Sequence, residues 1–130
     1  MVESSERPVL VVEDDPKVRA LLAETLKGDG FAVETFESAL GLFPEMKRLR
    51  PCAVVLDLGL PYRSGLRLLT ELKDDPATAA VPVIIVSGLV DHLSPERAAL
   101  ATAVLSKPFQ PAVLLATLRT ALSAGSCQPE

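Results

Sequence analysis

Three acidic residues in a row, Glu13, Asp14 and Asp15, follow directly after an apolar run at 9–12. Carboxylates a few ångströms apart repel one another unless a cation, a helix terminus or solvent relieves the repulsion. Acids before a helix often serve as caps, so this run by itself does not define a site. The chemistry it could support depends on which other residues lie near it.

Three further polar residues stand at the ends of apolar runs: Asp57, Ser87 and Lys107. Each has an ordinary explanation alone, as a turn residue or a solvated loop lysine. If the runs are parallel strands in the order 2-1-3-4-5, however, their carboxyl ends meet at one edge of the sheet, where ligands bind. A cluster of carboxylates there would suit Mg²⁺, and one carboxylate could accept a phosphoryl group while the lysine and the hydroxyl contact its oxygens.

The elements that would position these residues are short apolar runs alternating with segments of helical period. This alternation is typical of βαβ units around a parallel sheet that is buried on both faces. The sequence therefore predicts an α/β fold. The strands are expected at 9–13, 32–36, 53–57, 83–87 and 104–106.

Helix signals occur between these runs. Asp15 is a candidate N-cap with Pro16 at the first helical position, before an apolar face of Val18, Leu21, Leu22 and Leu26 that ends at 28–30. Pro44 falls within the second helix, which should be short or kinked there. The remaining helices are expected to follow Ser64, to open at 94–96 as a short segment, and to run from Pro111 to Leu122.

The composition favours one domain, which we place at 1–124, followed by a polar tail at 125–130. The chain has 130 residues, of which 48% are hydrophobic, and a net charge of −4 without a basic run. Direct nucleic-acid binding is therefore not expected. No apolar run approaches the roughly 18 residues of a membrane span and the N-terminus is acidic, so we expect a cytoplasmic protein. Cys52 and Cys127 are expected to be reduced thiols.

Four motifs, in this order and spacing, carry a resemblance to a known family. They are VLVVEDD at 9–15, DLGLP at 57–61 with Gly65 following, VPVIIVSG at 81–88, and SKPF at 106–109. Across 8–122 the chain resembles a response-regulator receiver domain of two-component signalling. The resemblance implies a flavodoxin-like (βα)5 sandwich of three layers around a five-stranded parallel sheet of order 2-1-3-4-5.

The resemblance also implies a Mg²⁺ site. Asp14 would bind the metal directly, Glu13 would act through metal-bound water, and Asp57 and the backbone carbonyl of Gly59 would be further ligands. Asp15 corresponds to no metal ligand of the family and is better explained as the helix cap. Mg²⁺ would thus relieve the repulsion at Glu13 and Asp14, and a helix terminus would relieve it at Asp15.

The same resemblance makes Asp57 the phosphoacceptor, with Ser87 and Lys107 contacting the phosphoryl oxygens and a cis bond between Lys107 and Pro108. A histidine kinase or a histidine phosphotransfer protein would be the donor, and the phosphorylated state would bind another protein. Such a domain catalyses only its own phosphorylation and dephosphorylation.

Departures from the family pattern concern signalling more than chemistry. Val104 stands where the family usually has Tyr or Phe, and the segment between Ser87 and Lys107 is shorter than usual, so the switch and the fourth helix should be atypical. Gly59 leaves the phosphoryl pocket uncovered, which predicts a short-lived phosphate. His92 and Tyr62 are expected to be surface residues.

Two other functions are compatible with the residues. The fold could serve as an adaptor that binds a protein partner without phosphorylation. Val104 and the short fourth helix favour this function, whereas the intact set of acids, hydroxyl and lysine disfavours it. A phosphatase or phosphotransferase at the same sheet edge is disfavoured, because Gly59 stands where such a hydrolase would need a second Asp as general acid.

Overall fold

The central sheet has five parallel strands in the order β2-β1-β3-β4-β5, which confirms the predicted order. The computed structural model describes residues 7–59, 65–88 and 93–123. Crossover connections between parallel neighbours place every carboxyl end at the same edge of the sheet. The strands are β1 (Val9–Val12), β2 (Val33–Phe36), β3 (Ala53–Leu56), β4 (Val83–Ser87) and β5 (Ala103–Ser106).

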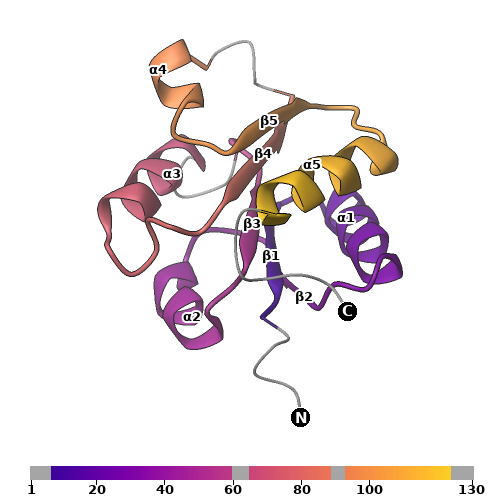
Figure 1. Ribbon diagram of the computed structural model, residues 1–130, viewed down its shortest axis with the longest axis horizontal. Coiled ribbons are helices and arrows are strands. Elements are labelled where there is room, and N and C mark those ends of the chain that lie inside the picture. Colours follow the sequence, from indigo (N-terminus) through magenta and orange to yellow (C-terminus); the bar gives the residue numbers. More distant parts are fainter. Residues whose placement is uncertain (1–6, 60–64, 89–92, 124–130) are drawn as a thin grey trace.

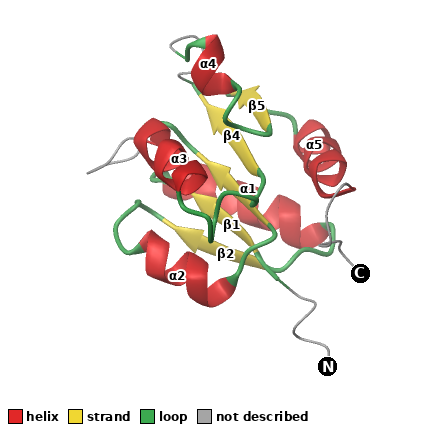
Figure 2. Cartoon of the chain, turned by 60° about the vertical axis from the view of Figure 1, so that its left-hand side comes forward, coloured by secondary structure: helices red, strands yellow, loops and turns green. Residues whose placement is uncertain are grey.

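Helices cover both faces of this sheet and form the expected three layers (Figures 1 and 2). One face packs against leucines of α1 and α5, and the other against leucines of α3 together with Leu42 and Met46 of α2. The helices are α1 (Pro16–Gly28), α2 (Leu42–Leu49), α3 (Gly65–Asp74), α4 (Pro95–Ala98) and α5 (Pro111–Ser123).

The continuous apolar runs are explained by the two covered faces. In β1, Val9 and Val11 point into the α1/α5 core, whereas Leu10 and Val12 point into the α2/α3 core, and all four side chains are fully buried. The strands β3 and β4 are buried in the same way. The edge strands β2 and β5 are less buried, so their sequences carry a weaker apolar signal.

The first helix begins as predicted and buries a slightly different face. Asp15 accepts hydrogen bonds from the backbone N–H groups of Lys17 at 2.9 Å and Val18 at 3.4 Å, which confirms it as the N-cap. The prediction that Leu21 faces the core was wrong, because this side chain is 46% exposed. Leu22 and Leu26 are one turn apart and define the buried stripe, and Leu21 is rotated away from it by about 100°.

The second helix accommodates Pro44 because it begins late. It starts at Leu42, so Pro44 lies in the first turn, where its missing N–H is not needed. The flanking residues Gly41 and Arg50 both have left-handed backbone conformations, with φ of 73° and 50°. The helix is therefore short, as predicted, and it is not interrupted.

Several expectations fall outside the described residues. These are the cap at Ser64, the surface positions of Tyr62 and His92, the tail at 125–130 and the thiol of Cys127. Cys52 is buried as a reduced thiol whose Sγ donates to Arg7 O at 3.3 Å, and the domain boundaries remain predictions. No helix in the described part of the chain is both long and apolar enough to cross a membrane.

Candidate functional site

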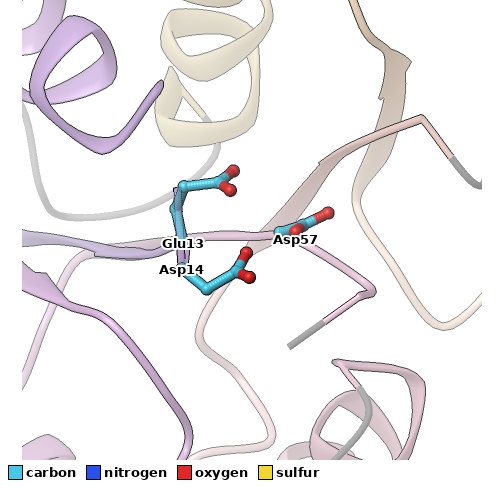
Figure 3. Close-up of side chains that lie close together, drawn as sticks. All are labelled: Glu13, Asp14 and Asp57. Atoms are coloured by element: carbon cyan, nitrogen blue, oxygen red, sulfur yellow. The ribbon is translucent and has the colours of Figure 1, made fainter. Parts of the chain in front are cut away.

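The paired strands β1 and β3 bring the acidic residues together. Val12 of β1 and Leu56 of β3 are register partners, so the residues that follow them, Glu13 and Asp57, leave the sheet side by side. The backbone N–H of Asp57 donates to Val12 O at 3.0 Å. Carboxylate oxygens of Glu13, Asp14 and Asp57 lie within 4.8 Å of one another (Figure 3). The structure thus brings together the three carboxylates that sequence reasoning selected.

Lys107 reaches this cluster from the end of β5, the edge strand three positions from β1 in the sheet. It follows β5, and its backbone N–H donates to Ser87 O at 3.0 Å. Its Nζ lies 2.9 Å from Glu13 Oε1 and 3.8 Å from Asp57 Oδ1. The bond from Lys107 to Pro108 is cis, as expected. One ammonium therefore stands between two of the three carboxylates.

Glu13 is the most buried acid of the cluster, with 1% of its surface exposed. Its Oε2 accepts a hydrogen bond from the backbone N–H of Asp15 at 3.2 Å. Burial raises the pKa of Glu13 above its ordinary value, and repulsion from Asp57 adds to this, whereas the contacts with Lys107 and Asp15 N–H oppose the rise. Glu13 therefore depends on neighbouring positive charge to stay ionised.

The other two carboxylates differ in accessibility. Asp57 is buried with 7% exposure, and Asp14 is exposed at the rim. The cluster thus combines a buried acid in contact with Lys107, Glu13, with an acid exposed to solvent, Asp14. Three carboxylates facing one space form a hard oxygen donor set that fits Mg²⁺, which commonly keeps several waters beside one or two protein ligands.

Ser87 and Gly59 lie at the same edge of the sheet. Ser87 is the last residue of β4, the strand next to β3, and is fully buried. Gly59 is exposed and lies two residues beyond Asp57. The contacts assigned to the Ser87 hydroxyl and to the Gly59 carbonyl remain predictions.

Two positioning residues were not given a role from the sequence. Gly65 begins α3 and packs against the backbone of Asp57 and Leu58: a Cβ at this position would lie 2.2 Å from Asp57 O and 2.7 Å from Leu58 Cα. Arg19 of α1 donates from Nη1 to Glu13 O at 2.9 Å. The available signals were the glycine after the DLGLP motif and an arginine one turn into the helix that follows the acids.

The strand order defines a flavodoxin-like α/β domain, and the acidic cluster is a candidate ligand site at the switch point between β1 and β3. The family model for the response regulator receiver domain matches residues 9–119. The chain therefore belongs to the response regulator receiver domain family.

Among curated proteins, the chain is similar to the KDP operon transcriptional regulatory protein KdpE of Escherichia coli, with 38% identity over 117 residues that cover 88% of this chain. It spans about half the length of KdpE and of the other curated transcriptional regulators that it matches.

Solved structures agree with this assignment. A sensor protein from Polaromonas sp. JS666 has a TM-score of 0.83 at 29% identity, covering 91% of this chain and 98% of that one. The receiver domain of NtrX from Brucella abortus has a TM-score of 0.81 at 27% identity, covering 90% and 99% of the two chains.

Proposed function

We propose that this receiver domain is a phosphorylation switch in which Asp57 accepts a phosphoryl group in the presence of Mg²⁺. The observation that carries the proposal is the single ammonium of Lys107 placed between Glu13 and Asp57 within a three-carboxylate cluster. Acids that served only to cap α1 would not need a lysine from β5, which is three positions from β1 in the sheet.

Among the three acids, Asp57 is best suited to be the nucleophile. Glu13 is held on one oxygen by Lys107 and on the other by the N–H of Asp15. Asp14 lies in solvent, without the enclosure that strengthens charge interactions at a reacting group. Asp57 is nearly buried, is anchored through its backbone N–H, and lies within reach of Lys107.

In the proposed reaction, a carboxylate oxygen of Asp57 attacks the phosphorus of the donor. A bond forms between that oxygen and phosphorus, and the bond from phosphorus to the donor nitrogen or oxygen breaks. The leaving group departs with the electron pair and is protonated from solvent. The Lys107 ammonium then contacts the phosphoryl oxygens, where the negative charge now lies, instead of the Asp57 carboxylate. The Ser87 hydroxyl donates a hydrogen bond to one of these oxygens.

Glu13, Asp14, Asp57 and the carbonyl of Gly59 would hold the Mg²⁺. When bound, the ion supplies positive charge that offsets the repulsion between these carboxylates and an incoming phosphoryl group. Two contacts hold Glu13 in place at the end of β1: Lys107 contacts its carboxylate, and Arg19 donates to its backbone carbonyl.

The partners follow from the family. A receiver domain implies a histidine kinase or a histidine phosphotransfer protein as donor, and the reaction is confined to phosphorylation and dephosphorylation of the domain itself. KdpE is named as a transcriptional regulator. Because this chain spans only about half of that relative, the output of the protein is proposed to depend on contacts that this domain makes with another protein or domain.

The route from Asp57 to such a contact is proposed to be atypical. Val104 is partly buried against the α2/α3 core and has no long side chain to rotate inward. The fourth helix spans only Pro95–Ala98 and has no buried residue. The β5 and α4 region is therefore expected to respond by a shift of backbone segments rather than by an aromatic rotamer change.

Intact-mass spectrometry after incubation with Mg²⁺ and phosphoramidate tests this function. The wild-type chain should gain the mass of one phosphoryl group, and Asp57→Asn should not. Lys107→Met should be phosphorylated at least tenfold more slowly, because the charge that follows the transferred group is lost. Asp74→Asn removes an exposed acid at the end of α3 and should behave as wild type.

An adduct that persists in Asp57→Asn would place the acceptor elsewhere. If no adduct forms, beryllofluoride binding separates a short-lived phosphate from an inactive site, since the complex mimics the phosphorylated state without hydrolysis. Absence of both the adduct and the beryllofluoride complex would contradict the proposal and favour a phosphorylation-independent adaptor.

A further inference from the structure

A groove of about 830 Å³ lies at the edge of the sheet opposite to the acidic cluster. It is lined by residues that precede β1, β3 and β4, by one side of α2 and by the end of α5. This is the edge at which the chain enters β1 in Figure 1. Its volume is in the range of small-molecule sites, which are commonly 300–1,000 Å³ by rough survey values.

The lining combines an apolar floor with cations. Val81, Pro82 and Ala121 contribute partly exposed apolar surface, whereas Met46 and Leu122 also line the groove but are buried. Three cationic residues complete the lining: Arg7, Lys47 and Arg50. No carboxylate occurs among its described lining residues; Asp75 lies 3.8 Å from Lys47 Nζ but is not part of the lining. A ligand with an apolar body and a negative charge would match this surface.

Arg50 is held at this groove in an unfavourable backbone conformation. Its φ of 50° is left-handed, and its N–H closes α2 by donating to Met46 O at 2.8 Å. Helix ends of this kind usually carry glycine, or sometimes asparagine, because a Cβ makes the conformation costly. An arginine at such a position indicates that its side chain has a use, since strained residues gather at functional sites.

A second arginine fixes this backbone. Arg7 donates from Nε to Arg50 O at 2.7 Å and from Nη2 to Pro51 O at 3.1 Å. The segment that leads from α2 into β3 is therefore tied to the residue before β1. Hydrogen bonds thus hold the Arg7 side chain and the backbone of Arg50 in place, whereas Lys47 is an exposed side chain of α2.

We propose that this groove is a binding site for a small anion that carries an apolar group, such as an aryl or alkyl sulfonate or carboxylate. The apolar group would pack on Val81, Pro82 and Ala121, and the anionic group would contact Arg50 and Lys47. The site lies at the other edge of the sheet from the acidic cluster and shares none of its residues.

Titration of the ¹⁵N-labelled full chain with 1-naphthalenesulfonate tests the site. The backbone amide signals of Cys52, Val81 and Leu122 should move together and saturate. Arg50→Gly suits this test because glycine accepts the left-handed backbone, so the variant removes the charge without disturbing the turn. Arg50→Gly should weaken binding about fivefold, which is the effect of losing one exposed ion pair of about 1 kcal/mol. The double variant Arg50→Gly with Lys47→Gln should bind still more weakly.

Three comparisons make the result decisive. Lys27→Gln removes an exposed cation of α1 that does not line the groove, and it should bind as wild type. Neutral 1-naphthalenemethanol and inorganic sulfate should each bind more weakly than 1-naphthalenesulfonate. The proposal is overturned if the groove amides do not respond, if the double variant binds as wild type, or if the neutral compound binds equally well.

Discussion

Gly65→Ala should disturb both the stability of the domain and the position of Asp57. An alanine Cβ at this site would lie 2.2 Å from Asp57 O, whereas ordinary contacts begin at 3.4 Å. The atoms in contact belong to the backbone of Asp57 and Leu58, which cannot rotate away like a side chain. The start of α3 and this backbone must therefore separate by roughly 1 Å. Overpacking of this kind costs about 1–3 kcal/mol. The lower entropy of alanine in the unfolded chain offsets about 0.4–1 kcal/mol of it.

Urea denaturation and the rate of phosphorylation measure the two effects. The urea midpoint should fall by about 0.3–1 M for each kcal/mol lost, because small proteins have m-values of about 1–3 kcal/mol/M. A shift of about 1 Å in a reacting group can slow a reaction about a hundredfold, so phosphorylation by phosphoramidate should slow by at least tenfold. The slowing should persist well below the unfolding midpoint, where the variant is fully folded.

Gly28→Ala is the matched control. Gly28 ends α1, and a Cβ added there would have no neighbour within 4 Å and no positive φ to strain. Alanine at this position should stabilise the domain by about 0.4–1 kcal/mol and leave phosphorylation unchanged. If Gly65→Ala matches Gly28→Ala in both measurements, the proposed contact between α3 and the Asp57 backbone does not constrain the site.

Other predictions concern the acids and the loop beside Asp57. Asp15→Ala should cost about 1 kcal/mol of stability through loss of the cap and leave Mg²⁺ affinity unchanged. Asp14→Ala should abolish Mg²⁺ binding in calorimetry with no loss of stability. Equal Mg²⁺ affinities in the two variants would contradict these separate roles of Asp14 and Asp15. Burial raises the pKa of Glu13 in the folded state, so the native protein holds the carboxyl proton more tightly than the unfolded chain does. Without Mg²⁺, protonated Glu13 therefore contributes stability that is fully present below about pH 4.5. This stability is lost as pH rises through the folded-state pKa. Glu13→Gln should remove this slope from urea melts between pH 4 and 8, and an unchanged slope would assign it to another group. Gly59→Asn should lengthen the phosphoryl half-life severalfold by covering the acyl phosphate from water, and an equal or shorter half-life would show that water does not enter on that side.

The architecture was predictable because its signals are local. Continuous aliphatic runs such as 9–12 and 53–56 indicate strands buried on both faces, and Asp15 with Pro16 marks a helix start without reference to the rest of the chain. The incorrect predictions concern features that depend on tertiary packing: which residues of a helix are buried and where a helix begins. Leu21 and Leu22 are equally apolar, and only the position of the sheet determines which one is buried. The start of α2 depends on Gly41 and on packing of Leu42, which the apolar pattern around Pro44 did not reveal.

The sequence by itself determined which residues could do chemistry: acids after two apolar runs, a serine after a third and a lysine after a fourth. It could place them at one edge only on the assumption of a strand order. The tertiary structure decided their partners. Lys107 contacts Glu13 at 2.9 Å and Asp57 at 3.8 Å because β5, β4 and β3 lie side by side, although these residues are far apart in the sequence. The packing of Gly65 on Asp57 and the cationic groove at the other edge likewise depend on segments that only the folded chain brings together.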